Sequence, residues 1–568
     1  MSLFIGGRSF FVPGIYAIVR VIQRGGSAIP AFNVGLIISK QQTGIPYTAG
    51  IGANKVPASQ FILPFADTQS FTEHGGPEGD NEGIVPFRYA KANGAGTVYT
   101  LNVNPLTKAT GGVIQNNEGS PVDALTISSV GYGAPVNDIS ITIATSVHTI
   151  IPPKNTTLLD ADSGTDDTVT VKNKNHPFRV GDTVLIVDNV YAAPEELTIE
   201  SIDREAGTIT FTDNISASAT TANYARLFQE DTDNQEVSGT LDTPAKVLDF
   251  YNASQYLRAE IAEGVTAMPT TFAKEYIQNL TSATKATSPE AQASDWQAIV
   301  DNFEGWNEEF AVANGIYLRV ILPVTSDAAN HASFRDLGAQ MRSANKPIFV
   351  IAGADTGDYA LDTSEANHPT SRATLLNSSD VQLAGIGLDG HPAYQSLAAV
   401  LFGITLSSEI NHNLTRDLIL ANTVEDSFFE RSPDAEMYTQ AGVIVPIQKP
   451  TGRHINQGLT TYQDQSTTFN PSTKQTYLSM LRHLSDFDLR VMMELLDAQV
   501  GADGVTKEVL SGVVQQASDN LMNNLGYIKN YRIVRIFKQG VAFHIEREVA
   551  LDTPTDFIGL TNVIVLEN

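Results

Sequence analysis

Two apolar runs with a helical segment between them constrain the fold more than any other feature of the sequence. IYLRVILPVTS (316–326) and PIFVIAG (347–353) are short and nearly continuously apolar, the pattern of strands that are covered on both faces. HASFRDLGAQMRSANK (331–346) lies between them and has helical periodicity. This spacing is that of a βαβ unit, so the region predicts a partly parallel sheet.

Flanking segments extend this mixed pattern in both directions. The sequence is β-rich from 84 to 250, with strand candidates at 97–103, 124–130 and 138–146 and a hairpin turn at 205–207. Later patterns predict helices over 242–264, 288–306, 476–501 and 506–526, and then strands over 531–537 and 541–551. We therefore expect a mixed α/β (α+β) multidomain fold, with an inserted all-β domain at about 150–230.

Composition excludes several classes of function. The 568 residues carry a net charge of −27, and this excess of acid argues against affinity for nucleic acid. The chain has no cysteine, so disulfides, thiolate metal sites and cysteine nucleophiles are excluded. No apolar stretch reaches about 18 residues and the N-terminus lacks the pattern of a signal peptide, so we expect a soluble protein without membrane insertion.

One glycine-rich segment offers a candidate cofactor site. Gly385, Gly387 and Gly390 have G-x-G-x-x-G spacing before an expected helix, and Glu409 follows at the distance expected of a ribose ligand. His391-Pro392 and the poor strand pattern before Glu409 weaken the match, so a structural loop is preferred and an NAD(P)-dependent enzyme stays an alternative. The histidines and carboxylates form no recognisable catalytic or metal constellation, and we expect no enzyme activity, cofactor or metal.

The last fourteen residues, TDFIGLTNVIVLEN, have the pattern of a strand with two apolar faces. Ile558, Leu560, Ile564 and Leu566 alternate with Val563 and Val565, whereas chain ends usually have few contacts. Such a strand requires a partner, because an uncovered apolar edge pairs readily with other chains.

Basic residues gather near both ends of the sequence. No acidic residue precedes Asp67, whereas residues 151–250 hold 18 acidic against 7 basic residues. This unevenness fits either copies that dock on one another or a chance fluctuation. KNYRIVRIFK (529–538) contains no acid, and simple alternation places Arg532 and Lys538 on one face and Lys529 and Arg535 on the other. These charges either protect a strand edge from aggregation or contact an acidic partner.

The order of these segments resembles the contractile tail sheath proteins of bacteriophages and related contractile particles. FFVPGIYAIV (10–19) followed by AFNVGLIISKQQTGIP (31–46) resembles the arm and first core strand of that family. GAPVNDISITI (133–143), the βαβ region and MYTQAGVIVPI (437–447) with GLTTY after it are similar to its middle and core, and the segment from YLSMLRHL to the end is the most similar.

The resemblance implies a core built from both N- and C-terminal parts, with extended terminal arms that complete sheets of neighbouring copies. Its implied divisions are an arm at 1–30, core at 31–85, β-rich domain at 86–149, outward insert at 150–230, α/β domain at 231–430, C-terminal core at 431–549 and donated strand at 550–568. The arm residues are Phe10, Phe11, Val12, Ile15, Tyr16, Ile18, Val19, Ile558, Leu560, Val563, Ile564, Val565 and Leu566. The candidate charged contacts are Arg20, Arg24, Lys529, Arg532, Arg535 and Lys538.

The function implied by the resemblance is that of the sheath subunit in a virion tail. Such a subunit polymerises as a helix or as stacked rings, hexameric in the family pattern, around an inner tube protein and contacts baseplate and tail terminator proteins. It is assembled in the host bacterial cytoplasm and contracts from a metastable state to drive the tube through the host envelope. A β-rich adhesin or another tail structural protein is the second alternative to this interpretation.

Overall fold

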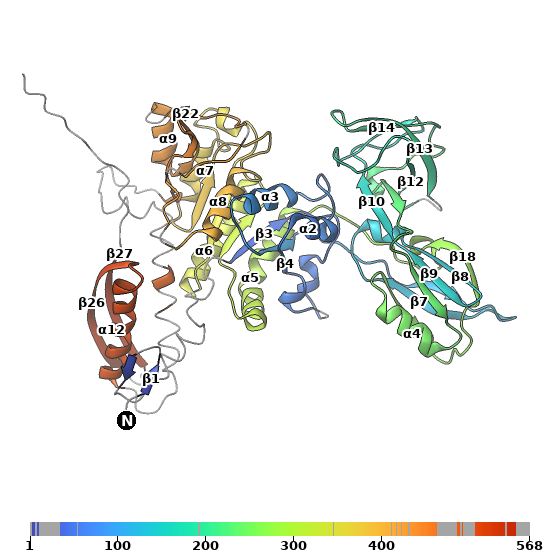
Figure 1. Ribbon diagram of the computed structural model, residues 1–568, viewed down its shortest axis with the longest axis horizontal. Helices are drawn as coiled ribbons and strands as arrows, with labels where there is room; N and C mark the ends of the chain where they lie inside the picture. Colours follow the sequence, from blue (N-terminus) through green and yellow to red (C-terminus); the bar gives the residue numbers. More distant parts are fainter. Residues whose placement is uncertain are drawn as a thin grey trace, which may run out of the picture. The chain divides into compact units, whose positions relative to one another are not determined.

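The computed structural model describes most of the chain and divides it into two compact units. The described residues are 3–5, 8–10, 34–53, 55–190, 194–344, 346–410, 412–415, 417–421, 423–429, 432–462, 486–488, 491, 506–539 and 542–551. Unit 1 comprises 1–36, 89–98 and 310–568, and unit 2 comprises 37–88 and 99–309 (Figure 1). Unit 1 therefore joins N- and C-terminal parts of the sequence, as the resemblance implied.

A parallel sheet forms the centre of unit 1. Its strands are hydrogen-bonded in the order β23 (Val443–Ile444), β21 (Val381–Ala384), β20 (Phe349–Gly353) and β19 (Val320–Pro323). Each pair along this run is parallel, which confirms the predicted βαβ unit. All four strands are buried throughout, as their nearly continuous apolar sequences require.

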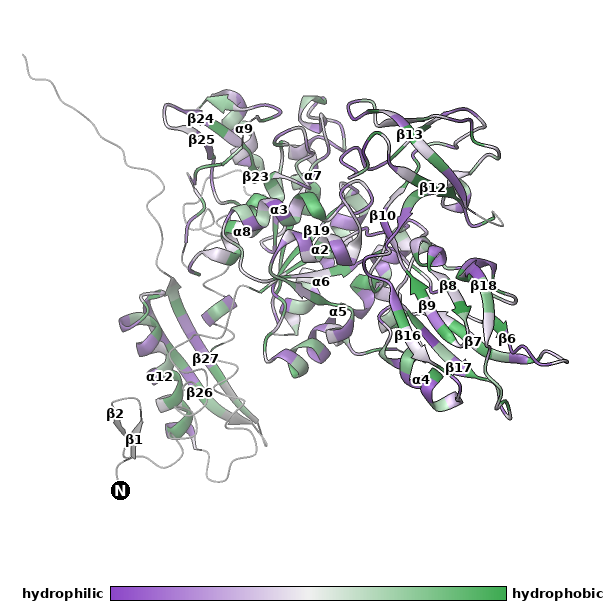
Figure 2. Cartoon of the chain, turned by 45° about the vertical axis from the view of Figure 1, so that its right-hand side comes forward, coloured by the Kyte–Doolittle hydropathy of each residue, from purple (hydrophilic) through white to green (hydrophobic). Residues whose placement is uncertain are grey.

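Helices connect and cover these strands. Helix α6 (Ala328–Ser343) crosses from β19 to β20, and its N-cap residue Asp327 accepts hydrogen bonds from the backbone N–H groups of Ala329 and Asn330. Helix α8 (Leu397–Ser407) is almost entirely buried and packs against the sheet, and Figure 2 shows its hydrophobic colouring. The other helices here are α7 (Pro369–Leu376) and α9 (Pro433–Ala441), and a small sheet has the order β22 (Phe428–Phe429), β24 (Pro446–Lys449), β25 (Gly452–Ile455).

A helix and a hairpin form the C-terminal part of unit 1. They are α12 (Lys507–Asn523), β26 (Ile528–Gln539) and β27 (Ala542–Leu551), so the helix predicted over 506–526 and both predicted strands are confirmed. Most of the helix predicted over 476–501 lies outside the described residues. Gly526, between helix and hairpin, has φ +67°, a left-handed conformation that glycine adopts at little cost. The first residues also form a small hairpin, β1 (Leu3–Ile5) with β2 (Arg8–Phe10).

Unit 2 is mainly β-structure. It contains β3 (Gly35–Ser39, from Ile37 onward), β5 (Val98–Asn102, from Tyr99 onward) and β4 (Leu63–Phe65), hydrogen-bonded in that order. A four-stranded sheet has the order β16 (Glu236–Thr240), β9 (Val147–Ile151), β8 (Ser140–Ala144), β18 (Thr271–Tyr276), and a three-stranded sheet the order β17 (Leu257–Ile261), β7 (Asp123–Ser129), β6 (Gly112–Gln115). Its helices are α2 (Thr68–Gly75), α4 (Pro244–Ala253), the start of α3 (Ile84–Ala92) and most of α5 (Ala293–Asn314).

The segment from 153 to 230 forms its own six-stranded sheet. The order is β10 (Pro153–Leu158), β15 (Arg226–Glu230), β12 (Thr183–Val187), β13 (Glu195–Asp203), β14 (Thr208–Phe211), β11 (Thr168–Thr170), and one apolar cluster fills it. The hairpin β13–β14 turns through Gly207 at φ +76°, which confirms the predicted turn. On β15, the buried Arg226 pairs with Asp138.

The helix expected over 242–264 is shorter than the sequence indicated. Helix α4 ends at Ala253, where the Ser254 hydroxyl accepts the backbone N–H groups of Tyr256 and Leu257 and turns the chain. The following residues form β17, in which buried Leu257 and Ala259 alternate with exposed neighbours and pair with β7. Burial at period two against an existing strand outweighed the helical propensity of this segment.

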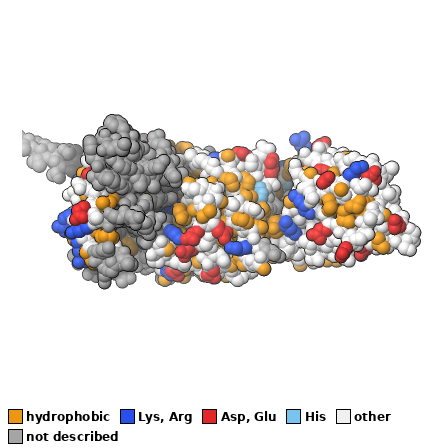
Figure 3. All heavy atoms as spheres, turned by 90° about the horizontal axis from the view of Figure 1, so that it is seen from below, with side chains coloured by type: hydrophobic (Ala, Val, Ile, Leu, Met, Phe, Trp, Pro, Cys, Tyr) orange, Lys and Arg blue, Asp and Glu red, His pale blue; other side chains and the backbone are white. Residues whose placement is uncertain are grey.

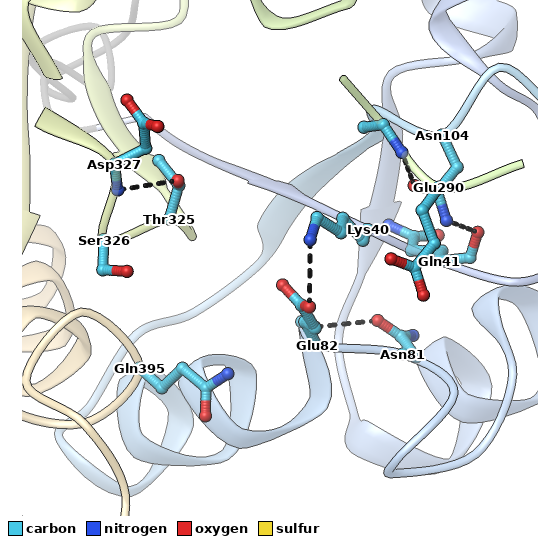
Figure 4. Close-up of polar contacts among 12 residues, drawn as sticks. Lys40, Gln41, Asn81, Glu82, Asn104, Glu290, Thr325, Ser326, Asp327 and Gln395 are labelled. Carbon is cyan, nitrogen blue, oxygen red and sulfur yellow. Dashed lines mark hydrogen bonds and ion pairs between the residues drawn. The ribbon is translucent and has the colours of Figure 1, made fainter. Parts of the chain in front are cut away.

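Polar residues at strand ends make local structural contacts. In unit 2, Lys40 after β3 points to Glu82 (3.5 Å), and the Asn104 side-chain amide donates to the Gln41 carbonyl oxygen (2.9 Å; Figure 4). In unit 1, the Thr325 hydroxyl after β19 accepts the Asp327 backbone N–H (3.2 Å; Figure 4).

None of the described helices has the length and hydropathy that crossing a bilayer requires.

Candidate assembly interface

Helix α12 covers one face of the β26–β27 hairpin. The Thr506 hydroxyl caps the helix by accepting the Val509 backbone N–H (3.3 Å). The buried positions of the helix follow one stripe, formed by Leu510, Val513, Val514, Ala517 and Leu521, and they pack against β26. The helical period of these apolar residues thus gives the hairpin one dry face.

Two polar contacts fix the register between helix and hairpin. The Tyr531 hydroxyl on β26 donates to Asp519 (2.6 Å), and burial followed by this hydrogen bond raises the pKa of Tyr531 to about 12. Arg547 on β27 donates to the Ser518 hydroxyl (2.6 Å) and forms an ion pair with Asp488. Tyr531 and Arg547 therefore both face the helix.

The other face of the hairpin is polar and exposed. Arg532 pairs with Glu548 (2.8 Å) and Arg535 pairs with Glu546, directly across the two strands. Because Glu546 and Glu548 lie two residues apart on one strand, both arginines lie on the same face. The prediction that they lie on opposite faces is wrong: the register shifts between Ile533 and Arg535, which leaves Val534 as a bulge and reverses the alternation.

The basic residues of 529–538 therefore have acidic partners on the opposite strand, although 529–538 itself contains no acid. The signal that was missed is the alternation in EREVAL, where Glu546 and Glu548 flank Arg547 at period two. Since each arginine is paired and about two thirds exposed, this outward face is close to electroneutral. Such a face fits the protected-edge interpretation better than a strongly basic docking surface.

The hairpin has two long backbone edges. In the part of the chain that the structure describes, β26 and β27 pair only with one another, over twelve and ten residues. An isolated two-stranded hairpin is marginally stable in water, so a further strand at either edge adds hydrogen bonds and apolar cover.

The remaining predicted contact residues have different positions. Lys529 lies exposed at a second register shift of β26, and Lys538 belongs to the same strand. Phe10 ends β2. Residues Phe11, Val12, Ile15, Tyr16, Ile18, Val19, Arg20, Arg24, Ile558, Leu560, Val563, Ile564, Val565 and Leu566 lie outside the described residues.

The glycine loop after β21 is filled by the chain's own groups. One Glu425 carboxylate oxygen accepts the Gly387 backbone N–H (3.1 Å) and the other accepts that of Gly357. A Cβ at Gly387 would lie 2.3 Å from the His391 carbonyl oxygen.

A carboxylate thus sits where a dinucleotide site would place phosphate, at the carboxyl ends of parallel strands. The segment before Glu409 is helix α8 and not a second strand. Both observations disfavour the dinucleotide alternative.

Unit 2 contains an open cleft of about 1270 Å³, lined by residues that include Asp80, Arg88 and Lys154. Its two basic side chains are paired, Arg88 with Glu78 and Lys154 with Asp231. On the face that Figure 3 shows, acidic and basic side chains are interspersed. Among the described residues, no three histidine or carboxylate side chains are grouped so as to hold a metal ion.

Comparisons with known proteins identify the fold. No protein-family model matches the sequence, and no curated protein matches it either. Among solved structures, the sheath tail protein of Listeria innocua aligns with 95% of this chain and 99% of its own, with a TM-score of 0.51 and 12% identity. The sheath tail protein of Desulfitobacterium hafniense aligns over 92% and 98%, with a TM-score of 0.48 and 12% identity. The chain therefore has the mixed α/β multidomain fold of a sheath tail protein.

Proposed function

We propose that this chain is the structural subunit of a contractile tail sheath. The observation that carries the proposal is the fold shared with the Listeria innocua sheath tail protein over 95% of this chain. At 12% identity that likeness concerns the fold, so the function rests on the fold together with the hairpin edges and the apolar strand pattern of residues 555–568.

The terminal strand is the proposed donor in assembly. In this proposal, residues 555–568 of one copy add to a β26–β27 hairpin of a neighbour, and the N-terminal arm makes a second link. Burial of Ile558, Leu560, Ile564 and Leu566 would contribute about 6–12 kcal/mol before ordering costs, at roughly 1.5–3 kcal/mol for each side chain. Because each copy gives and receives arms, many such contacts would act together.

The proposed assembly surrounds an inner tail tube. Copies would stack as rings, proposed to be hexameric, between a baseplate and a tail terminator, and form in the host cytoplasm as part of a virion tail. Contraction would proceed by repacking of subunit surfaces from a metastable extended state, while joints near 20–30 and 550–556 keep the copies connected. A joint of about seven residues spans at most ~25 Å, so copies can rotate without separating.

Electron microscopy of purified chains tests the proposal. We expect tubes or stacked rings from the full chain and dispersed particles from a chain ending at Leu551. A quadruple variant with serine at Ile558, Leu560, Ile564 and Leu566 should also disperse, because it retains the segment and loses one apolar face.

The matched control carries Thr561→Ser and Asn562→Ser in the same segment and should assemble like the parent. Dispersed particles from the full chain at every concentration tested, or tubes from the chain ending at Leu551, would contradict the proposed strand donation.

A further inference from the structure

Three successive residues, Asp486, Phe487 and Asp488, contact both the parallel-sheet part and the C-terminal part of unit 1. The network at Asp486 belongs to the sheet part. Its carboxylate is fully buried and accepts hydrogen bonds from Arg319 (3.0 Å) and Arg342 (2.6 Å). Arg342 also pairs with Asp380, which joins a second carboxylate to the same network.

The positions of these partners make Asp486 an anchor to the sheet. Arg319 directly precedes β19, Asp380 directly precedes β21, and Arg342 lies in the last turn of α6. The network therefore lies at the amino ends of the parallel strands, whereas ligands of open α/β sheets bind at the carboxyl ends. Arg319 also donates to the Pro347 carbonyl oxygen (2.7 Å), which ties the start of the β20 segment to the same group.

The next two residues contact the C-terminal part. The Phe487 ring packs edge-on against Tyr527, with centroids 5.5 Å apart, and Tyr527 directly precedes β26. Asp488 pairs with Arg547 of β27, and both side chains are largely buried. Arg547 also donates to Ser518 of α12, so this single pair reaches both elements of the C-terminal part.

We propose that residues 486–488 are a rigid joint that fixes the helix–hairpin part on the parallel-sheet part. Asp486 anchors one side, Asp488 anchors the other, and Phe487 fills the space between. Removal of one partner from the buried ion pair on either side is costly in free energy, because it leaves an unpaired buried charge. If the hairpin receives a neighbour's strand, as in the proposed function, the joint transmits the force that the neighbour exerts on the hairpin to the parallel sheet.

Distance measurements between two spin labels test the joint in the full chain. The natural absence of cysteine allows labels at Leu375→Cys on α7 and Gln515→Cys on α12, both exposed. We expect a narrow distance distribution in the parent. Asp488→Asn should raise the population of other distances about tenfold or more, because Arg547 then lacks its charged partner.

Matched variants separate the joint from general loss of structure. Asp519→Asn removes a carboxylate contact within the C-terminal part and should leave the distance distribution narrow. Asp488→Glu keeps the charge and should give a distribution nearly as narrow as that of the parent. Asp486→Asn should broaden it too. Because this variant also risks unfolding the buried network, the result from Asp488→Asn decides.

An unchanged distribution in Asp488→Asn, or equal broadening in Asp519→Asn, would overturn the joint. Labelled chains are mixed with an excess of unlabelled chains, so each distance is measured within one chain whether or not the chains assemble. If the parent chain forms no tubes and Asp488→Asn broadens the distribution, only the proposed function is contradicted. If the parent chain forms tubes and Asp488→Asn leaves the distribution unchanged, only the joint is contradicted.

Discussion

The buried pair of Asp138 and Arg226 gives the sharpest stability prediction for unit 2. Both side chains are fully buried, and two guanidinium nitrogens donate to the carboxylate at 2.6 Å. Arg226 also donates to Asn189 and to the Tyr224 carbonyl oxygen, each at 2.9 Å. The pair therefore connects β15 of the six-stranded sheet to the segment that ends at Asp138.

Replacement of one partner should cost much more than replacement of both. Asp138→Leu leaves a buried guanidinium group without its anion, and we expect about 3–5 kcal/mol of local destabilisation. The double variant Asp138→Leu with Arg226→Met removes both charges, and we expect it to lie within about 2 kcal/mol of the parent. The coupling between the two positions should then exceed about 1 kcal/mol.

Native-state hydrogen exchange of the peptide that covers β15 measures this local free energy, which suits a chain with several domains better than a single melting temperature. Asp242→Leu is the control, because its pair with Lys246 is more than half exposed and its loss should leave the exchange of that peptide unchanged. If the double variant is as unstable as the sum of the two single variants, the pair is not coupled and this reasoning is wrong.

Three further predictions follow from other side chains. Burial raises the pKa of Asp80 from 3.8 to about 7, so the stability it contributes is present below about pH 4 and lost as pH rises toward 7. Asp80→Asn should therefore stabilise the region around Asp80 by up to about 4 kcal/mol at pH 8 and hardly at pH 4, as native-state hydrogen exchange at both pH values can check. Arg535→Ala should change the stability of the helix–hairpin part by under about 1 kcal/mol in urea titrations, because its pair with Glu546 is exposed. Glu425→Ala should destabilise the neighbouring loops by about 1–3 kcal/mol, since two glycine N–H groups lose their acceptor, and hydrogen exchange of these loops measures the change. Addition of NAD should not shift the melting temperature of the parent, and a shift would support the enzyme alternative.

Strand and helix patterns predicted the individual elements well where burial follows a simple period. The runs at 316–326 and 347–353 became parallel strands on either side of α6, and the C-terminal helix and two strands lie where the pattern placed them. The pattern failed at 254–261, where residues of helical propensity instead pair with β7. Local preference is worth only tenths of a kcal/mol for each residue, and burial against a neighbour exceeds it.

Contact residues were harder to predict than elements. The sequence showed the basic residues of 529–538, but their acidic partners come from β27. The face on which each basic residue lies depends on a bulge that no sequence pattern marked. Asp486 and Asp488 had the appearance of ordinary acids, because the two arginine partners of Asp486 lie 167 and 144 residues away and that of Asp488 lies 59 residues away along the chain.

The sequence by itself determined the alternation of buried strands and helices, the acidic balance and the absence of cysteine, and it predicts a terminal strand at 555–568 that needs a partner. These properties follow from residue type and spacing over a few turns of chain. Only the tertiary structure decided that Glu425 fills the glycine loop, that Arg532 and Arg535 share a face, and that Asp486 and Asp488 bind different parts of unit 1. Each of these depends on which distant groups meet a side chain after folding, and the local period of a sequence does not encode that information.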